Sequence, residues 1–408
     1  MANVEIKILM LGARRAGKTS LLAAIADTFK EESLKQHLII EEVATNNGAR
    51  CTLSDKINSL KKFMKDFEGK IVLNDEDATN TFHDYVIKVC LPGMSGEMRM
   101  TFTDANGEFY YQGDRNFEKI KNRILEYDVI IVAVDSVYLM ESVNEENDLC
   151  GKILSDAFNQ VDSVHTLLST LHDNNGKNAR LVIFTPVKCE KWAKSGDIDR
   201  VTQRVEESYS TTIKALKAFS NIEVIVLPVQ TLGNVVFDSH HEAYQVTNKK
   251  GITLRCTEMN DNECVLLEDG NTYKLKEDDI LQADHTATID GYGFSRPNSW
   301  FKVANRVYAP HNCEQMAYNI LHFLIAKTLF AKKLEQEKKK KGRWWKVLIG
   351  VPFGALGVSV MAAYLFMSAR MGSLDIEKLQ QTLTEMDKKG LWKHNGEGIK
   401  VLNKGLLN

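Results

Sequence analysis

Apolar and polar positions alternate along the chain in a way that predicts strands and helices in turn. Continuous apolar runs, which are typical of strands covered on both faces of a sheet, lie at 4–11, 127–136, 179–187 and 222–229. Helical periodicity lies at about 18–29, 53–67, 148–171, 198–219 and 313–333, and residues 31–80 are otherwise polar and irregular. Two alternating segments, 82–92 and 98–104, flank a turn and predict a β-hairpin. This order predicts an α/β fold, with a mostly parallel sheet and helices on both of its faces.

The pattern changes between residues 246 and 287. Short alternating runs are divided there by Asn-Asp and Asp-Gly turns, so we expect a small β-rich insertion in a domain that covers 1–330. Its acidic turns are interpreted as a solvated face rather than as a metal site.

A segment of 21 residues, 347–367, contains no charge. A helix of this length would span about 30 Å, the thickness of a bilayer core, so a transmembrane helix is predicted; the alternative is a buried core helix. The linker before it, 331–346, holds eight Lys or Arg against two Glu, whereas the tail, 368–408, holds seven against five acidic residues. The positive-inside rule then predicts a single-pass membrane protein with its N-terminal domain in the cytoplasm and its tail across the bilayer. Gly350 and Gly354 favour helix pairing, although glycine is common in such helices.

Composition narrows the functional classes. The 408-residue chain has a formal net charge of −2, so no nucleic-acid partner is expected. Its seven cysteines form no CxxC pair, which argues against a disulfide framework or a zinc site and suits a reducing cytosol. The N-terminus enters a strand pattern directly, so a cleaved secretion signal is not expected.

The strongest chemical signal is GARRAGKT at 12–19, which matches G-x-x-x-x-G-K-[ST] between an apolar strand and a helix. Backbone N–H groups of such a loop surround phosphate oxygens. Lys18 is predicted to contact the terminal phosphates, and the Thr19 hydroxyl to coordinate Mg²⁺. The predicted nucleotide-binding residues of this loop are Gly12, Ala13, Arg14, Arg15, Ala16, Gly17, Lys18, Thr19 and Ser20.

A second phosphate-side signal is DANG at 104–107, a DxxG match at the end of the hairpin. In such a motif the aspartate, here Asp104, holds Mg²⁺ through water, and the backbone N–H of the glycine, here Gly107, reaches the γ-phosphate. The alternative interpretation is an Asp-rich β-turn.

Two base-side signals follow at the ends of later strands. VKCE at 187–190 lies where a [NT]-K-x-D motif is expected, so Lys188 is predicted to pack on the base and Glu190 to accept hydrogen bonds from guanine. After the next strand, Gln230 and Thr231 lie in a loop that is predicted to offer a backbone N–H to guanine O6.

These four motifs, in this order, resemble those of P-loop GTPases of the translation-factor-related (TRAFAC) class, over about residues 1–330. The sequence VYAPHNCEQMAYNILHFL at 307–324 is similar to the stretch around the last helix of bacterial double-GTPase-like families found in conflict and phage-defence neighbourhoods. The resemblance implies a GTPase domain that uses Mg²⁺ and GTP and, in the narrower families, a part in antiviral defence. The transmembrane segment and the tail lie outside it.

Two departures from the motifs bear on specificity and rate. Val187 stands where Asn or Thr is usual, and Glu190 replaces Asp, so ATP or a relaxed site remains an alternative to GTP. Glu108 follows DxxG, where Ras-like GTPases carry a water-orienting Gln. A carboxylate accepts from water but repels the γ-phosphate, so slow hydrolysis is expected, unless this position is not used.

Other candidates leave alternatives open. Arg14 is a candidate catalytic residue, because an arginine in the loop can point at the γ-phosphate as a cis arginine finger; the alternative is that Arg14 and Arg15 are a solvent-facing basic pair. Thr45 and Thr52 are both candidates for the switch-I threonine that ligates Mg²⁺. The adjacent histidines at 240 and 241 are interpreted as a solvated pair rather than as metal ligands.

Together these signals predict a cytoplasmic GTPase domain, tethered by one membrane helix, that binds Mg²⁺·GTP, hydrolyses it slowly and acts as a switch or trigger at the membrane. Lys18, Glu108 and Arg14 are the expected catalytic residues, and a homo-oligomer or a partner protein is possible. One alternative is a membrane-disrupting or assembly-forming effector whose nucleotide domain controls oligomerisation. Another is an ATP-using P-loop enzyme.

Overall fold

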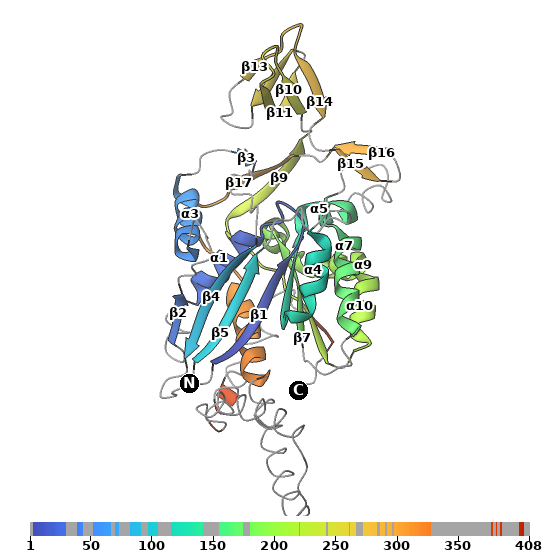
Figure 1. Ribbon diagram of the computed structural model, residues 1–408. Coiled ribbons are helices and arrows are strands. Elements are labelled where there is room, and N and C mark those ends of the chain that lie inside the picture. The colour runs from blue at the N-terminus through green and yellow to red at the C-terminus, as the bar shows by residue number, and fades with distance from the viewer. Residues whose placement is uncertain are drawn as a thin grey trace, which may run out of the picture.

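The computed structural model describes residues 3–29, 39–43, 52–66, 70–72, 82–90, 97–104, 116–141, 155–173, 180–219, 221–241, 244–260, 262–266, 272–283, 286–289, 292–295, 298–327, 377, 381, 384–385 and 400–403. Their arrangement is shown in Figure 1.

The body of the molecule is an eight-stranded sheet in the order β18-β8-β7-β6-β1-β5-β4-β2. The strands are β1 (Asn3–Leu11), β2 (Ile39–Val43), β4 (His83–Cys90), β5 (Glu97–Asp104), β6 (Val129–Asp135), β7 (Arg180–Val187), β8 (Ile222–Val226) and β18 (Lys400–Asn403). Neighbours from β8 to β5 pair in parallel, whereas β4, β2 and β18 are antiparallel to their partners. The predicted mostly parallel sheet and the predicted hairpin, β4–β5, are thereby confirmed.

Helices cover both faces of this sheet, as the apolar periodicity predicts. One face packs against α1 (Lys18–Thr28), α3 (Leu53–Asp66) and a helical stretch at 313–327. The other packs against α4 (Phe117–Arg123), α5 (Ser136–Met140), α7 (Val161–Ser169), α8 (Glu190–Ser195), α9 (Ile198–Ser208) and α10 (Ser210–Lys217). The fully buried residues of β6 and β7 reach both clusters, which explains their continuous apolar runs.

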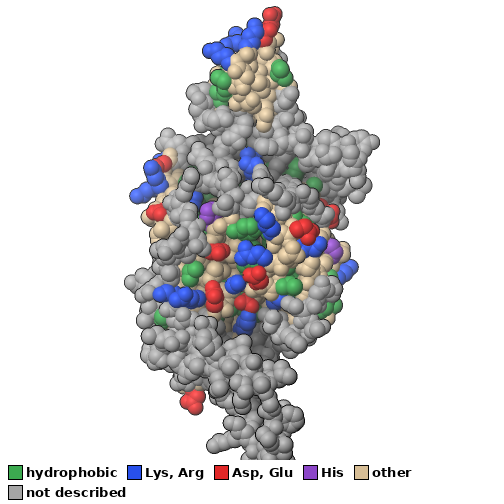
Figure 2. Space-filling model, in the orientation of Figure 1, with side chains coloured by type: hydrophobic (Ala, Val, Ile, Leu, Met, Phe, Trp, Pro, Cys, Tyr) green, Lys and Arg blue, Asp and Glu red, His purple; other side chains and the backbone are tan. Residues whose placement is uncertain are grey.

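Part of the second face is polar. Along β4 and β5 the buried side chains alternate with half-buried ones such as Lys88, Arg99 and Thr101. On the side of the molecule seen in Figure 2, acidic and basic side chains are interspersed. Ion pairs between exposed side chains of the body include that of Lys7 with Glu126, at 3.3 Å.

Two helix predictions need correction. The helix expected over 198–219 is two helices, because the backbone of Tyr209 leaves the helical region (φ −95°, ψ 19°) between α9 and α10. Of the helix expected over 148–171, the described part begins at residue 155 and is helical over 155–158. The helix is then interrupted at 159–160, where Gln160 is left-handed with φ 54°, and α7 begins at Val161.

Residues 31–80 were expected to be irregular apart from one helix, yet they supply two strands. Ile39–Val43 forms β2 at one edge of the main sheet. A second short strand, β3 (Lys70–Val72), pairs with β17 (Asn298–Val303), which in turn pairs with β9 (Val235–His241).

The β-rich insertion consists of small antiparallel sheets. One sheet has the order β13-β12-β11-β10-β14, with strands β10 (Tyr244–Thr247), β11 (Thr253–Asn260), β12 (Glu263–Leu266), β13 (Thr272–Lys274) and β14 (Ile280–Ala283). A separate pair is formed by β15 (Thr286–Ile289) and β16 (Tyr292–Ser295). The five-stranded sheet projects from the body in Figure 1, and the β9–β17 ribbon lies between it and the main sheet. Antiparallel structure therefore extends on both sides of the expected 246–287.

The C-terminal tail contributes a strand to the main sheet. In β18, Lys400 pairs with Val226 and Val401 with Ile225 of β8. A tail strand paired in this sheet does not fit a tail that lies across a bilayer from the domain, and membrane attachment itself stays a prediction. None of the helices in the described ranges is long and apolar enough to cross a membrane, and the segment predicted to do so, 347–367, lies outside those ranges.

Candidate functional site

The loop between β1 and α1 has the strained backbone that its glycines predict. Gly12 has φ 137° and Gly17 has φ 95°, both in a region that side chains disfavour. A Cβ at Gly12 would lie 2.5 Å from the carbonyl oxygen of Ala133, so only glycine permits this approach between the loop and β6. Arg15 is also left-handed, with φ 64°. The loop is thus folded tightly over the carboxyl ends of β1 and β6.

Lys18 is held over this loop. Its side chain is buried, with the residue 7% exposed, and its Nζ donates to the carbonyl oxygens of Gly12 at 2.9 Å and Ala13 at 3.0 Å. Gly17 is the N-cap of α1, so no side chain caps the helix N-terminus, and the first turn of α1 carries no acidic residue. A buried ammonium beside a helix N-terminus of this kind forms a positive environment suited to an anion.

Thr19 and Asp104 meet at the same edge. The Thr19 hydroxyl donates to Asp104 Oδ2 at 2.7 Å, and Asp104 lies at the end of β5 opposite Met10. Asp104 is only 1% exposed, and its Oδ1 has no hydrogen-bond partner among the described residues. Burial raises the pKa of Asp104, while the Lys18 ammonium and the Thr19 hydroxyl lower it. A hydroxyl beside a carboxylate with a spare buried oxygen fits the oxygen ligands that Mg²⁺ prefers.

Two basic neighbours of Asp104 were not predicted. His83, the first residue of β4, is the direct antiparallel partner of Asp104, so the two side chains share one face of the hairpin. Lys56 lies on α3, and both residues lower the pKa of Asp104 through their charge. The hairpin register was the signal that pointed to His83; nothing in the polar pattern of α3 distinguishes Lys56 from its neighbours.

Within the described residues, no group of three or more His, Cys, Asp or Glu side chains could hold a metal ion. A Mg²⁺ ion held by Thr19 and Asp104 would take its remaining ligands from phosphate and water oxygens.

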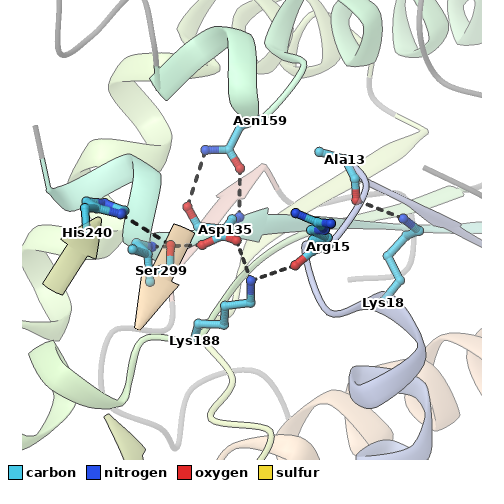
Figure 3. A network of polar contacts seen from close by, with 9 residues as sticks. Ala13, Arg15, Lys18, Asp135, Asn159, Lys188, His240 and Ser299 are labelled. Carbon is cyan, nitrogen blue, oxygen red and sulfur yellow. Dashed lines mark hydrogen bonds and ion pairs between the residues drawn. The ribbon is translucent and has the colours of Figure 1, made fainter. Parts of the chain in front are cut away.

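On the base side, Lys188 points back to the phosphate loop. It is left-handed, with φ 57°, and its Nζ donates to the carbonyl oxygen of Arg15 at 2.6 Å and to Asp135 Oδ2 at 2.6 Å (Figure 3). Val187 is fully buried, and its Cγ2 would lie 3.8 Å from a Cβ at Gly17. The strand end at 187–188 is thus packed against the phosphate loop.

Glu190 begins α8 and is turned inward. It is 2% exposed, and burial raises the pKa of its carboxyl group to about 7, against the lowering effect of hydrogen bonds from backbone N–H groups that include those of Leu232 and Gly233. The carboxyl group therefore ties the 187–190 segment to the loop that holds Gln230 and Thr231. Thr231 itself is 5% exposed.

The segment 307–312 packs against the loop that holds Gln230 and Thr231. Gln230 and His311 exchange two backbone hydrogen bonds, of 3.1 and 2.9 Å. Asn312 Nδ2 donates to the carbonyl oxygen of Pro228 at 3.0 Å. Gly233 passes so close to Ala309 that a Cβ there would lie 1.7 Å from the Ala309 oxygen. The YAPHN sequence, which the nucleotide motifs do not explain, thus buttresses the base-side loop.

The remaining candidates are placed as follows. Ala13 and Ala16 are buried, whereas Arg14, Arg15, Ser20 and Gly17 are half-buried. Thr52 caps α3, because its hydroxyl accepts from the Asp55 N–H and donates to the Asp55 carboxylate. His240, in β9, stacks on Tyr138 of α5, with ring centroids 5.5 Å apart, rather than lying in solvent. Gly107, Glu108 and Thr45 lie outside the described residues.

The sequence matches no protein-family model and no curated protein. Among solved structures, the chain is similar to the S. cerevisiae Ski7 GTPase-like domain. The GTP-bound structure has 12% identity, a TM-score of 0.29, and coverage of 75% of this chain and 76% of that one. The structure of the same domain bound to GDP and inorganic phosphate has 13% identity, a TM-score of 0.29, and coverage of 74% of this chain and 75% of that one. The structure of Methanosarcina barkeri Roco2 RocCORdC bound to GDP has 13% identity, a TM-score of 0.21, and coverage of 57% of this chain and 45% of that one. Likeness at these TM-scores carries no functional weight, so the site is interpreted from the geometry of this chain.

Chemically, one sheet edge combines three features. It has a buried ammonium over a tight glycine loop, a hydroxyl–carboxylate pair with a spare buried oxygen, and a buried carboxyl group beside a lysine stem. The first two suit a polyphosphate with a divalent cation, and the third suits a planar group with N–H donors.

Proposed function

We propose that this chain binds Mg²⁺·GTP at the edge formed by the phosphate loop, Asp104 and the 187–190 segment, and that it hydrolyses the nucleotide slowly. The observation that carries the proposal is the convergence of Lys18 Nζ on the loop carbonyls with the Thr19–Asp104 pair beside it. These groups come from three different elements, and they meet where a loop of this kind places the phosphates.

Each phosphate-side residue has a distinct part in binding. Lys18 exchanges its two carbonyl acceptors for phosphate oxygens, and the loop N–H groups orient the chain of phosphates. Thr19 and Asp104 hold Mg²⁺, which, when bound, neutralises charge on the β- and γ-phosphate oxygens. Lys56 adds positive charge near Asp104, and so favours an anionic ligand there.

Guanine is proposed as the base because the buried side chain on the base side, Glu190, is a hydrogen-bond acceptor and not a donor. A carboxylate has about four acceptor positions, so Glu190 can hold the backbone N–H groups of Leu232 and Gly233 and still accept from guanine N1–H. Adenine presents no such donor at that position, so an acceptor there disfavours it. The stem of Lys188 supplies the surface on which the base packs.

Slow hydrolysis and switching remain proposals drawn from the sequence. Glu108 in place of a glutamine predicts slow turnover, and Arg14 is the candidate for a cis arginine finger. An activator or a second copy of the chain would then be needed for faster turnover.

Membrane attachment through 347–367 also belongs to the proposal, on the strength of its uncharged sequence. Because β18 returns to the main sheet, the attachment we propose keeps the tail on the side of the domain. A defence role forms no part of it, since no described residue bears on one.

The proposal is tested by measuring GTP binding, with and without Mg²⁺, to the purified chain and to three variants. Lys18→Ala removes the charge that faces the phosphates, and Thr19→Ala removes a metal ligand. Thr28→Ala is the matched control, because its hydroxyl, in the last turn of the same helix, donates to the Ala24 carbonyl oxygen at 3.0 Å and bonds nothing else among the described residues.

We expect Lys18→Ala to lose affinity by about a hundredfold or more, since a charge-assisted contact contributes about 1.5–3 kcal/mol and Lys18 makes more than one. Thr19→Ala should lose the Mg²⁺-dependent part, and Thr28→Ala should bind as the wild type does. Wild-type affinity in a folded Lys18→Ala chain would refute the phosphate-loop assignment.

A further inference from the structure

An acidic residue that belongs to none of the nucleotide motifs forms an ion pair with Lys188, the base-side lysine. Asp135, the last residue of β6, is 1% exposed, and its Oδ2 lies 2.6 Å from Lys188 Nζ (Figure 3). The same ammonium donates to the Arg15 carbonyl oxygen at 2.6 Å. The ring of Phe301 lies 5.9 Å from it. A single half-buried ammonium therefore joins β6, the phosphate loop and the base-side strand.

Asp135 is itself fixed from several directions. Its Oδ1 caps α5 by accepting from the Val137 N–H at 3.0 Å. The side chain of Asn159 brackets its backbone, accepting from the Asp135 N–H at 2.7 Å and donating to the Asp135 carbonyl at 3.3 Å. A carboxylate held in this way offers Oδ2 at a set position, so the partner lysine has little freedom to move.

The substitution at 187 explains why such a tie is needed. Val187 has no polar side-chain atom, and its Cγ2 would lie 3.8 Å from a Cβ at Gly17, so its side chain presents an apolar surface to the phosphate loop. The polar link between the base-side strand and the phosphate loop is made instead by Lys188, one residue further on. The Arg15 carbonyl oxygen alone would compensate the charge of the Lys188 ammonium poorly, and Asp135 supplies the matching negative charge.

We propose that Asp135 is a positioning residue for nucleotide binding, which holds Lys188 extended against the phosphate loop so that base and phosphates are bound in one fixed relation. The inference rests on the proposed function and deepens it. It assigns to Asp135, through Lys188, the linking role that the side chain at position 187 cannot perform. Asp135 acts on the base and the loop, and not on the γ-phosphate.

The test uses Asp135→Asn in the full-length chain, with affinities for GTP and GDP measured in Mg²⁺. Asparagine keeps the shape and a cap acceptor for the Val137 N–H but removes the charge that faces Lys188. The matched control is Asp128→Asn, directly before the first residue of the same strand, whose carboxylate pairs with Lys327 and accepts from the Lys7 N–H. A third chain, Lys188→Met, keeps the apolar stem and removes the ammonium, and the double variant closes a mutant cycle.

We expect Asp135→Asn to weaken GTP and GDP equally, on the order of tenfold to a hundredfold. In the Lys188→Met background the same change should have no further effect. Asp128→Asn should lower the melting temperature without changing nucleotide affinity, which separates positioning from the general loss of an ion pair.

Wild-type affinity in a folded Asp135→Asn chain would overturn the inference and leave the proposed function standing. So would an equal loss in the Lys188→Met background, or an equal loss in Asp128→Asn. A wild-type chain that binds neither GTP nor GDP would overturn the proposed function, and the inference with it.

Discussion

Among single residues, Glu190 joins stability to recognition. Burial raises the pKa of its carboxyl group to about 7 from the ordinary value of 4.5. The folded chain therefore retains a proton on Glu190 at pH values where the unfolded chain has lost it. Since the folded state binds more protons between pH 4.5 and about 7, the free energy of unfolding falls as pH rises through this range.

The first prediction concerns this pH dependence. Glu190→Gln cannot ionise, so its free energy of unfolding should fall less between pH 5 and pH 8 than that of the wild type. The difference should reach about 3 kcal/mol, because one pKa unit corresponds to about 1.4 kcal/mol. Urea unfolding at several pH values measures it. If the two chains kept a constant difference across this range, the raised pKa of Glu190 would be wrong.

The residues that sequence alone could predict are those within a local motif. Lys18 and Thr19 are recognised by the spacing of the loop, and Asp104 by its place at the end of a strand. Asp135 escapes this kind of inference, because its partner, Lys188, is 53 residues away on another strand and no local pattern marks the pairing. His83 could have been found only by working out the register of the predicted hairpin, in which it pairs with Asp104.

At the scale of elements, the base-side loop depends on the 307–312 segment. The two are joined by backbone hydrogen bonds between Gln230 and His311, and by the close passage of Gly233 over Ala309. Since Glu190 bonds the same loop, a displacement of 230–233 would also displace the base acceptor. The support is thus part of the proposed site although it contributes no predicted contact to the nucleotide.

The second prediction compares two glycines that share a left-handed backbone. Gly233 has φ 75° and Gly196, which ends α8, has φ 80°; a Cβ at Gly196 meets nothing within 4 Å. Gly196→Ala should cost only the conformational penalty, about 1–2 kcal/mol. Gly233→Ala must also displace the Ala309 backbone, so it should cost about 1–3 kcal/mol more and weaken GTP binding. Thermal unfolding and nucleotide titration of both variants measure this, and equal losses would contradict the role given to Ala309.

Elements were predictable in proportion to their length and their apolar content. The runs that became β1, β6, β7 and β8 identify buried parallel strands, whereas β3 and β18, of three and four residues, are too short to show a period. The break between α9 and α10 carries neither Gly nor Pro. It falls at Tyr209, which is buried against Phe184 with ring centroids 5.1 Å apart, so that tertiary packing overrides helical periodicity there.

For the whole molecule, the position of the tail constrains how 347–367 can meet a membrane. A chain that crosses once between the domain and the tail cannot return Lys400–Asn403 to the edge of the main sheet. The net charge of the segments around 347–367 predicted the opposite arrangement, because it contains no information about strand pairing.

The third prediction tests this topology. A tag at Asn408 should be cleaved by protease on the same side of the membrane as the domain, because β18 pairs with β8. Membrane association should be lost on Leu356→Arg with Val358→Arg, since each charge adds roughly 2.5–3.5 kcal/mol to the cost of insertion. Carbonate fractionation and protease protection measure both effects. A protected tag would restore the single-pass topology, and a wild-type chain that is fully soluble without detergent would remove the membrane proposal.

The central claim is that one guanine nucleotide binds at the edge formed by the phosphate loop, Asp104 and the 187–190 segment. Its most direct test is calorimetric titration of the purified chain with Mg²⁺·GTP and, separately, with Mg²⁺·ATP. At a pH above 7, where Glu190 is ionised, we predict a single site for GTP and an affinity for ATP at least about tenfold lower, because one lost hydrogen bond to a buried charged acceptor costs about 1.5–3 kcal/mol. Equal affinity for the two nucleotides would contradict the guanine assignment, and no binding of either would contradict the account as a whole.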